Sequence, residues 1–369
     1  MKATPLFAAL LLLAGAAAAQ SPAEKALENQ VESGELAGAP YRIEIPGAWN
    51  GELVVYSHGY DLPDGKPFPI DARFQKALRD GFVGRGFAFV QSVYAAEGWA
   101  VKEGVEDTEI LRRHFVARHG QPKKTWITGH SMGGLIAALS LERYPEAYAG
   151  GIAFCPVLAP AAEFFESSLF DLLAAFDFLA GRNAGLPPLA DPASPPVTPE
   201  ALAAALAKSP AAAAILAARF GLRAEDVVSI PAFYQGIWQN LVGRAGGVPV
   251  DNSNTVYAGF GDDAAFNRGV RRIAGDAAAE LYLERYGTPT GRLQDPLLVI
   301  HTTYDPIVPP AVASRYDQLA TLAGNKERVR YRFVVADGHC NFSSEDTQKA
   351  FELLREWQTS GQPPAPGEL

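Results

Sequence analysis

The apolar and polar residues of this chain form strand-like and helix-like patterns in turn. Residues 41–45 alternate polar and apolar side chains, as a half-exposed strand does, whereas residues 52–57 and 88–93 are more continuously apolar, as buried parallel strands are. Further strand patterns occupy residues 125–128, 151–155, 297–301 and 329–335, and helical patterns lie at about 71–84, 104–119, 133–144, 310–323 and 344–358. Strands that alternate with helices predict an α/β fold, in which helices flank a mostly parallel sheet.

The alternation stops within residues 160–292, which contain almost no strand pattern and several helical ones. We interpret this segment as a helical cap, or lid, inserted into a core domain. The core domain would comprise residues 20–159 and 293–369. It would begin with a short helix and a loop, because residues 20–40 are polar and alanine-rich.

An apolar stripe at helical spacing lies within the insertion. It consists of Phe165, Leu169, Leu172, Phe176 and Leu179. Such a stripe packs onto the main domain, or it roofs an apolar pocket for an acyl or aromatic group. The same two interpretations apply to the aromatic residues Phe233, Tyr234 and Trp238. On the second interpretation, Phe165 and Leu169 are candidate substrate-binding residues.

The first nineteen residues have the pattern of a secretory signal peptide. Lys2 gives a positive start, an apolar run of nine residues extends from Leu6 to Ala14, and the small residues Ala17-Ala18-Ala19 before Gln20 form a cleavage site. The alternative is an uncleaved membrane anchor, but the apolar run is too short to span a bilayer. No second long apolar run follows. We therefore expect a secreted or periplasmic protein, with residues 1–19 removed and no membrane-spanning segment in its mature form.

Composition and charge indicate which kinds of binding partner are not expected for this protein. The chain of 369 residues has 48% hydrophobic and 20% charged residues, which is ordinary for a globular protein, and a net charge of −9. It contains no basic run of five or more residues, so nucleic acid and anionic membranes are not expected partners. The sequence also shows no cluster of metal ligands, and we predict neither a metal nor an organic cofactor.

Export would place the two cysteines, Cys155 and Cys340, in an oxidising compartment. A pair of cysteines in such a compartment is a candidate disulfide. The alternative is two buried free thiols.

The segment Gly129-His130-Ser131-Met132-Gly133 has the form G-x-S-x-G, with a strand pattern before it and a helical pattern after it. In that context the serine lies on a sharp strand-to-helix turn, which glycine neighbours allow because they have no side chains. The hydroxyl of Ser131 would then lie at a helix N-terminus, where backbone N–H groups favour a developing anion. The alternative is an ordinary glycine-rich turn.

A serine hydroxyl needs a base, and the base needs an orienting carboxylate. In a parallel sheet these groups are expected just beyond the C-terminal ends of strands. Asp305 follows the strand pattern at 297–301, and His339 lies in a glycine-containing loop after the last strand pattern. The order Ser131, Asp305, His339 is the order known for nucleophile-elbow enzymes. The other five histidines are less suitably placed.

The tetrahedral intermediate of acyl transfer needs two N–H donors for its oxyanion. One is expected from the backbone of Met132, directly after the nucleophile. The second is expected from Tyr60, in the loop after the strand at 52–57, with the N–H of Gly59 as the alternative. The Tyr60 ring, together with Gly59, is also a candidate part of the acyl site.

With these segments the chain resembles the α/β-hydrolase-fold serine esterases. The resemblance rests on residues 56–60, on residues 129–134, on residues 301–309, and on Gly338 with His339. It implies a central sheet of eight strands, with a lid inserted after the sixth. The aromatic residue at the oxyanion loop and the methionine after the serine are similar to those of secreted polyester-degrading hydrolases.

The cysteine after the histidine is similar to that of the tannase and feruloyl esterase group. That group pairs it with a cysteine just before the nucleophile, where this chain has His130. Cys155 instead ends the strand next to the nucleophile strand, and the histidine loop must fold back over that edge. A Cys155–Cys340 bridge that braces the catalytic histidine is our hypothesis.

The sequence therefore predicts a serine hydrolase that cleaves small-molecule or polymeric carboxylic esters through an acyl-enzyme. One alternative is a secreted, aminopeptidase-like serine peptidase, which would need a carboxylate such as Glu163, Glu166 or Asp171 to bind the substrate amine. Another is a polyester or feruloyl-type esterase with an open site. A non-catalytic binding protein is the remote alternative, because the candidate triad is complete.

Overall fold

The computed structural model describes residues 28–62 and 69–369. Its core is a sheet of nine strands in the described residues, in the order β1-β2-β4-β3-β5-β6-β7-β8-β9. The strands are β1 (Gln30–Leu36), β2 (Ala39–Ile45), β3 (Glu52–Ser57), β4 (Ala88–Ser92), β5 (Lys124–His130), β6 (Gly151–Phe154), β7 (Leu297–Tyr304), β8 (Val329–Asp337) and β9 (Gly367–Glu368). β2 pairs antiparallel with β1 and β4, and all other neighbours pair parallel. The predicted mostly parallel sheet is confirmed.

Helices cover both faces of this sheet because its central strands are apolar on both sides. Leu53 and Val55 of β3 face an apolar cluster shared with α3 (Val101–His119), α4 (Met132–Arg143) and α13 (Pro310–Leu322). Val54 and Tyr56 face the opposite cluster, which is shared with α2 (Pro69–Val83) and α14 (Ser344–Ser360). Each successive residue of a strand points to the other face, so a continuously apolar run is a strand buried on both sides.

The sheet has one strand more than the resemblance implies, and the N-terminal prediction was wrong in part. Residues 30–36 form β1, where we expected part of a short helix and a loop. Ala37 and Gly38, both with positive φ, turn the chain into β2. The side chains of β1 are mostly exposed and polar, so its strand conformation depends on pairing with β2 and leaves no apolar pattern. The predicted signal peptide lies outside the described residues.

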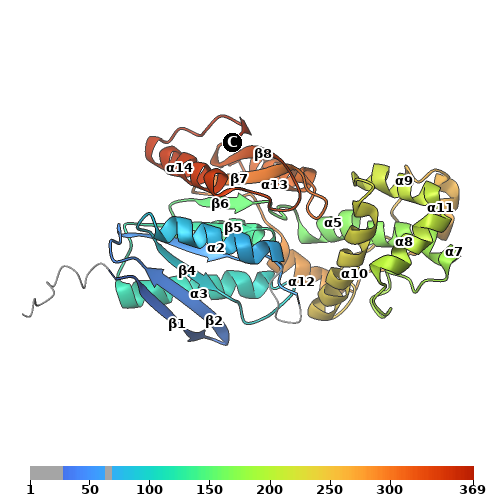
Figure 1. Cartoon of the computed structure of the whole chain (residues 1–369), viewed down its shortest axis with the longest axis horizontal. Helices are drawn as coiled ribbons and strands as arrows, with labels where there is room; N and C mark the ends of the chain where they lie inside the picture. Colours follow the sequence, from blue (N-terminus) through green and yellow to red (C-terminus); the bar gives the residue numbers. More distant parts are fainter. Residues whose placement is uncertain (1–27, 63–68) are drawn as a thin grey trace, which may run out of the picture.

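The span between β6 and β7 is helical, as expected, and we call residues 160–292 the cap. Its helices are α5 (Ala161–Phe164), η1 (Phe165–Phe170), α6 (Asp171–Phe176), η2 (Asp177–Gly181), α7 (Arg182–Ala184), α8 (Pro199–Lys208), α9 (Pro210–Phe220), α10 (Asp226–Ala245), α11 (Asp263–Gly269) and α12 (Ala277–Gly287). Figure 1 shows α7, α8, α9 and α11 grouped at one end of the molecule, whereas α5 and α12 lie nearer the sheet. A short 3-10 helix, η3 (Lys326–Arg328), precedes β8.

The cap has an apolar core that continues into the main domain. Leu169, Leu172 and Phe176 of the stripe are buried in one cluster with Trp238 of α10 and Leu135 of α4. The stripe thus serves mainly to pack the cap against itself and against the domain beneath it.

None of the helices in the described ranges is, by itself, both long and apolar enough to cross a membrane. One bent pair, α8 with α9, reaches that length and composition only when the two helices are taken together.

Candidate active site

Ser131 occupies a sharp turn between β5 and α4. Its backbone has φ 54° and ψ −125°, a conformation that is costly for a residue with a side chain. A Cβ atom on Gly129 would lie 2.1 Å from the carbonyl oxygen of Gly133, and one on Gly133 would lie 2.1 Å from the carbonyl oxygen of Ser57. Neither position can hold a larger residue without moving the backbone. The two glycines therefore make possible the close approach of strand and helix that aims the serine outward.

The three predicted triad residues lie in a hydrogen-bonded chain. Nε2 of His339 is 2.8 Å from Oγ of Ser131, and Nδ1 of His339 is 2.7 Å from Oδ2 of Asp305. With the proton of Nδ1 donated to the carboxylate, Nε2 is left to accept the proton of the serine hydroxyl. All three side chains come from loops just past the ends of β5, β7 and β8, and all three residues are buried.

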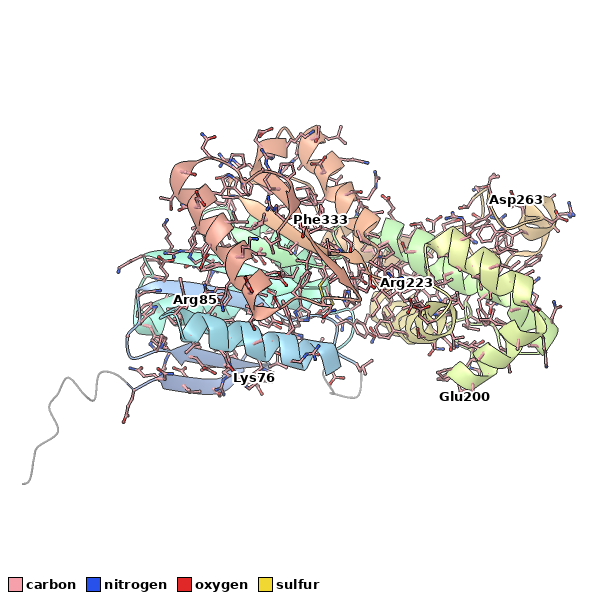
Figure 2. All side chains as sticks on the ribbon, turned by 45° about the horizontal axis from the view of Figure 1, so that its top comes forward. Lys76, Arg85, Glu200, Arg223, Asp263 and Phe333 are labelled. Carbon is pink, nitrogen blue, oxygen red and sulfur yellow. A yellow bond between two sulfur atoms is a disulfide. The ribbon has the colours of Figure 1, made fainter. Side chains whose placement is uncertain are left out.

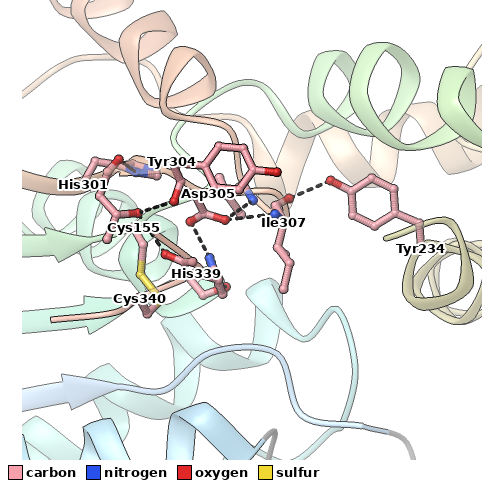
Figure 3. Close-up of polar contacts among 12 residues, drawn as sticks. Cys155, Tyr234, His301, Tyr304, Asp305, Ile307, His339 and Cys340 are labelled. Carbon is pink, nitrogen blue, oxygen red and sulfur yellow. Dashed lines mark hydrogen bonds and ion pairs between the residues drawn. A yellow bond between two sulfur atoms is a disulfide. The ribbon is translucent and has the colours of Figure 1, made fainter. Parts of the chain in front are cut away.

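The second oxygen of Asp305 fixes its orientation. Oδ1 accepts hydrogen bonds from the backbone N–H groups of Ile307 and Val308, each 2.9 Å long (Figure 3). Burial disfavours the charged carboxylate, but the charge of His339 and its hydrogen bond outweigh burial and lower the pKa of Asp305. Asp305 is thus held as a carboxylate, with one oxygen committed to the backbone and the other to the histidine.

The two predicted oxyanion donors lie on the same cavity as Ser131. Met132 is the first residue of α4, so its N–H has no carbonyl acceptor one turn earlier in the helix. Tyr60 lies in the loop after β3, which His58 holds in place. Nδ1 of His58 is 2.9 Å from the carbonyl oxygen of Gly59, and its ring stacks on that of Tyr94 at 3.9 Å.

The cavity above Ser131, which we call the catalytic cavity, is lined mainly by apolar side chains from the core and the cap. It contains about 480 Å³ of space outside protein atoms, including its opening. The lining residues are Tyr60, Trp99, Ser131, Met132, Val157, Phe164, Phe165, Phe233, Tyr234, Ile237, Ile307, Val308 and His339. An apolar lining with few polar groups is typical of a small-molecule site.

The structure divides the sequence-based candidates for substrate contact. Phe165 and Tyr60 line the catalytic cavity, and so do Phe233 and Tyr234. Leu169 and Gly59 do not line it. Leu169 lies about one turn of η1 beyond Phe165, within the apolar core of the cap. Trp99, which no pattern in the sequence singled out, also lines the cavity and packs edge-on against Phe165 with ring centroids 4.7 Å apart.

The acidic residues considered as an anchor for a peptide amine do not line this cavity. Glu163 forms an ion pair with Arg315, and Glu166 accepts a hydrogen bond from Thr255. Asp171 accepts a 2.6 Å hydrogen bond from Tyr257. Burial, opposed by this bond, raises the pKa of Asp171 to about 6. Glu166 and Asp171 are therefore engaged within the cap, and Glu163 is engaged between the cap and α13.

A disulfide joins Cys155, just after β6, to Cys340, next to His339 (Figure 3). The sulfur atoms of both cysteines and a ring nitrogen of His339 lie within 4.8 Å of one another, as metal ligands do. The two sulfurs are bonded to each other, however, and provide no thiolate for a metal. The bridge ties the histidine loop to the strand beside the nucleophile strand.

The double variant Cys155→Ser/Cys340→Ser is expected to lose stability and activity. The bridge closes a segment with a sequence separation of 185 residues, and losing such a bridge typically costs about 2–5 kcal/mol in the free energy of unfolding. Urea unfolding with and without a phosphine reductant measures the effect, since the reductant should act on the wild type alone. Two free thiols in denatured, unreduced wild type would contradict the bridge.

Four residues, which we call the cap latch, connect the cap to the loops of Asp305 and His339. Arg223, between α9 and α10, pairs with both carboxylate oxygens of Asp337 at 2.7 and 2.8 Å. Its guanidinium stacks 4.0 Å from the ring of Tyr304, whose hydroxyl donates to Asp226 of α10. Burial and this hydrogen bond raise the pKa of Tyr304 to about 12. Figure 2 places Arg223 where the cap meets the rest of the molecule.

The variants Arg223→Gln and Asp337→Asn are each expected to lower kcat/KM roughly twofold to fivefold, the usual range for an exposed ion pair. Tyr304 directly precedes Asp305, and Asp337 lies two residues before His339, so a loosened latch lets both loops move. The double variant should be no worse than either single variant, because both changes remove one interaction. Strictly additive losses would show that the pair does not act as a unit.

Comparison with known proteins identifies the family. A family model described as the alpha/beta hydrolase fold matches residues 106–346, more than half of the chain. The o-phthalyl amidase of Xanthobacter agilis is 22% identical over 411 residues, which cover 90% of this chain and 88% of that protein.

Two solved structures are also similar to this chain. One is an esterase from Pyrococcus furiosus, with 14% identity, a TM-score of 0.49, and coverage of 94% of this chain and 96% of that one. The other is Est1E from Butyrivibrio proteoclasticus, with 14% identity, a TM-score of 0.44, and coverage of 89% and 99%. Likenesses of this size do not bear on the substrate. By its sheet and by the match to the family model, the chain belongs to the alpha/beta hydrolase fold family.

Proposed function

We propose that this alpha/beta hydrolase is a secreted or periplasmic serine hydrolase that cleaves carboxylic esters. The observation that carries the proposal is the hydrogen-bonded chain from Ser131 through His339 to Asp305, beside an apolar cavity. A nucleophile, a base and an orienting carboxylate in this geometry suit acyl transfer.

In the first half-reaction, His339 takes the proton of Ser131 as the serine oxygen bonds to the ester carbonyl carbon. The carbonyl oxygen becomes an oxyanion, which accepts hydrogen bonds from the N–H groups of Met132 and Tyr60. The bond to the alcohol oxygen then breaks, and the His339 imidazolium gives its proton to that oxygen. The products are a free alcohol and an ester between Ser131 and the acyl group.

In the second half-reaction, a water molecule takes the place of the alcohol. His339 removes one of its protons as the water oxygen attacks the acyl carbon, and the proton returns to Ser131 as the acyl-serine bond breaks. Asp305 keeps Nδ1 protonated throughout and stabilises the imidazolium in both steps. No step needs a group outside the chain, the substrate and water.

Amide hydrolysis is the second candidate activity, because the o-phthalyl amidase of Xanthobacter agilis is similar to this chain over most of its length. The same residues can perform it, since His339 can protonate a departing amine as well as an alcohol. An amino-terminal peptidase is disfavoured, because none of the described acidic side chains lines the catalytic cavity to bind a free amine. The apolar lining favours uncharged acyl groups.

Export is part of the proposal. The signal-peptide pattern at residues 1–19 supports it, and so does the disulfide next to His339, because such bonds persist in oxidising compartments. Edman or mass-spectrometric analysis of the protein from the culture medium or periplasm is expected to find Gln20 at the N-terminus. A cytoplasmic protein that retains residues 1–19 would contradict export.

Covalent labelling tests the chemistry directly. An alkyl p-nitrophenyl phosphonate should modify Ser131 with release of p-nitrophenolate, and peptide mass spectrometry should locate the adduct there. Matched p-nitrophenyl esters and p-nitroanilides of one acyl group then compare ester with amide cleavage. Labelling elsewhere, or none, would remove the serine hydrolase proposal, and faster anilide cleavage would make the protein an amidase.

A further inference from the structure

Two cavities lie on opposite sides of one wall in this molecule. The first is the catalytic cavity. The second, which we call the cap cleft, contains about 890 Å³ of space outside protein atoms, including its opening. Both are lined by residues of α5 and η1, by α10, and by the loop at residues 306–309.

The residues of the wall divide between the two sides. On α10, Phe233 and Ile237 line the catalytic cavity, whereas Ile230 lines the cap cleft. In the loop at residues 306–309, Ile307 and Val308 line the catalytic cavity, while Pro306 and Pro309 line the cap cleft. Tyr234 is the residue that lines both. Its side chain therefore stands between the catalytic cavity and further open space.

The hydroxyl of Tyr234 anchors the ring in this position. It donates a 2.6 Å hydrogen bond to the carbonyl oxygen of Ile307, as Figure 3 shows. Tyr234 is buried, and burial raises its pKa well above the ordinary value, so the hydroxyl remains a donor. Because the N–H of Ile307 donates to Asp305, the same contact also secures the loop of the triad carboxylate.

The acyl group is the part of the substrate that suits a closed cavity. It remains bonded to Ser131 between the two half-reactions, whereas the alcohol must depart before water enters. We propose that Tyr234 forms the end of the acyl-binding cavity and restricts the enzyme to esters of short acyl chains. This inference rests on the proposed function, and it makes Tyr234 the residue that determines chain length.

The test compares how fast the p-nitrophenyl esters of ethylphosphonate (the ethyl compound) and dodecylphosphonate (the dodecyl compound) label Ser131. The alkyl group bonded to phosphorus takes the place of the acyl chain. The wild type should react faster with the ethyl compound. Tyr234→Ala joins the cavity to the cap cleft and should raise the dodecyl-to-ethyl rate ratio at least about tenfold. Tyr234→Phe keeps the ring, so it should keep the wild-type ratio while reacting more slowly with both compounds.

Two further variants serve as a control and as a replacement for Tyr234→Ala. Ile230→Ala enlarges the cap cleft alone and should leave the ratio unchanged. Tyr234→Leu opens the wall with a smaller loss of packing, and it replaces Tyr234→Ala if circular dichroism shows that the alanine variant is unfolded.

The outcomes separate this inference from the proposed function. A wild type that reacts faster with the dodecyl compound, or a folded Tyr234→Ala or Tyr234→Leu with the wild-type ratio, would overturn the role of Tyr234 and leave the serine hydrolase intact. A wild type in which neither phosphonate labels Ser131 would overturn the function itself.

Discussion

The variant Ser131→Ala is expected to lose ester hydrolysis, with kcat/KM for p-nitrophenyl acetate falling by roughly 10⁴-fold or more. Oγ of Ser131 lies 2.8 Å from Nε2 of His339, and the alanine side chain has no oxygen to attack the carbonyl carbon. Its removal leaves the oxyanion donors and the cavity in place, so substrate binding should persist. Initial rates of p-nitrophenolate release measure the loss.

Ser140 provides the matched control. It is a buried serine of α4, and its hydroxyl has no hydrogen-bond partner in the part of the chain that the structure describes. Ser140→Ala makes the same chemical change within α4, the helix that follows Ser131, and should retain wild-type activity. Near-equal activity of Ser131→Ala and wild type would place the nucleophile elsewhere.

The central sheet could be predicted because burial leaves a pattern in the sequence. Val54 and Val55 of β3 point to opposite faces and both are fully buried, so the middle of the strand, residues 53–56, is continuously apolar. β1 could not be predicted in the same way, since its exposed, polar residues would suit a loop equally well. Its conformation is determined by hydrogen bonds to β2, which depend on a partner and not on side-chain type.

The candidate triad could be located because parallel strands bring their C-terminal ends to one edge of the sheet. Ser131 and His339 are 208 residues apart, yet each follows such a strand end. The cavity was harder to predict, because it depends on how the cap lies over that edge. Phe165 and Leu169 both lie in η1, a π-helix, about one turn apart along its axis. The cavity reaches only the first of them.

The cap latch left no signal in the sequence. Arg223 and Asp337 are 114 residues apart and both are exposed, so neither spacing nor apolar pattern connects them. Charged residues of this kind are common on surfaces, and only the position of the cap makes these two a pair. Contacts between the cap and the core are therefore the part of the site that required the structure.

The variant Asp305→Asn is expected to lower kcat by roughly 10³–10⁴-fold while leaving the fold intact. In the wild type, Oδ1 accepts from the N–H groups of Ile307 and Val308. An asparagine can satisfy both donors only with its oxygen, so its NH₂ group must face Nδ1 of His339. A donor at that position favours the tautomer with the proton on Nε2, and that nitrogen can then no longer accept the proton of Ser131.

This orientation makes the loss specific to catalysis. The two backbone hydrogen bonds survive in Asp305→Asn, so the midpoint of urea unfolding should change little while kcat falls. Asp317→Asn, on α13 and away from the catalytic cavity, removes the same charge and should keep full activity. Activity of Asp305→Asn within about tenfold of the wild type would mean that the carboxylate does not set the tautomer of His339. Equal losses in both variants would instead assign the effect to net charge, because only Asp305 reaches the histidine.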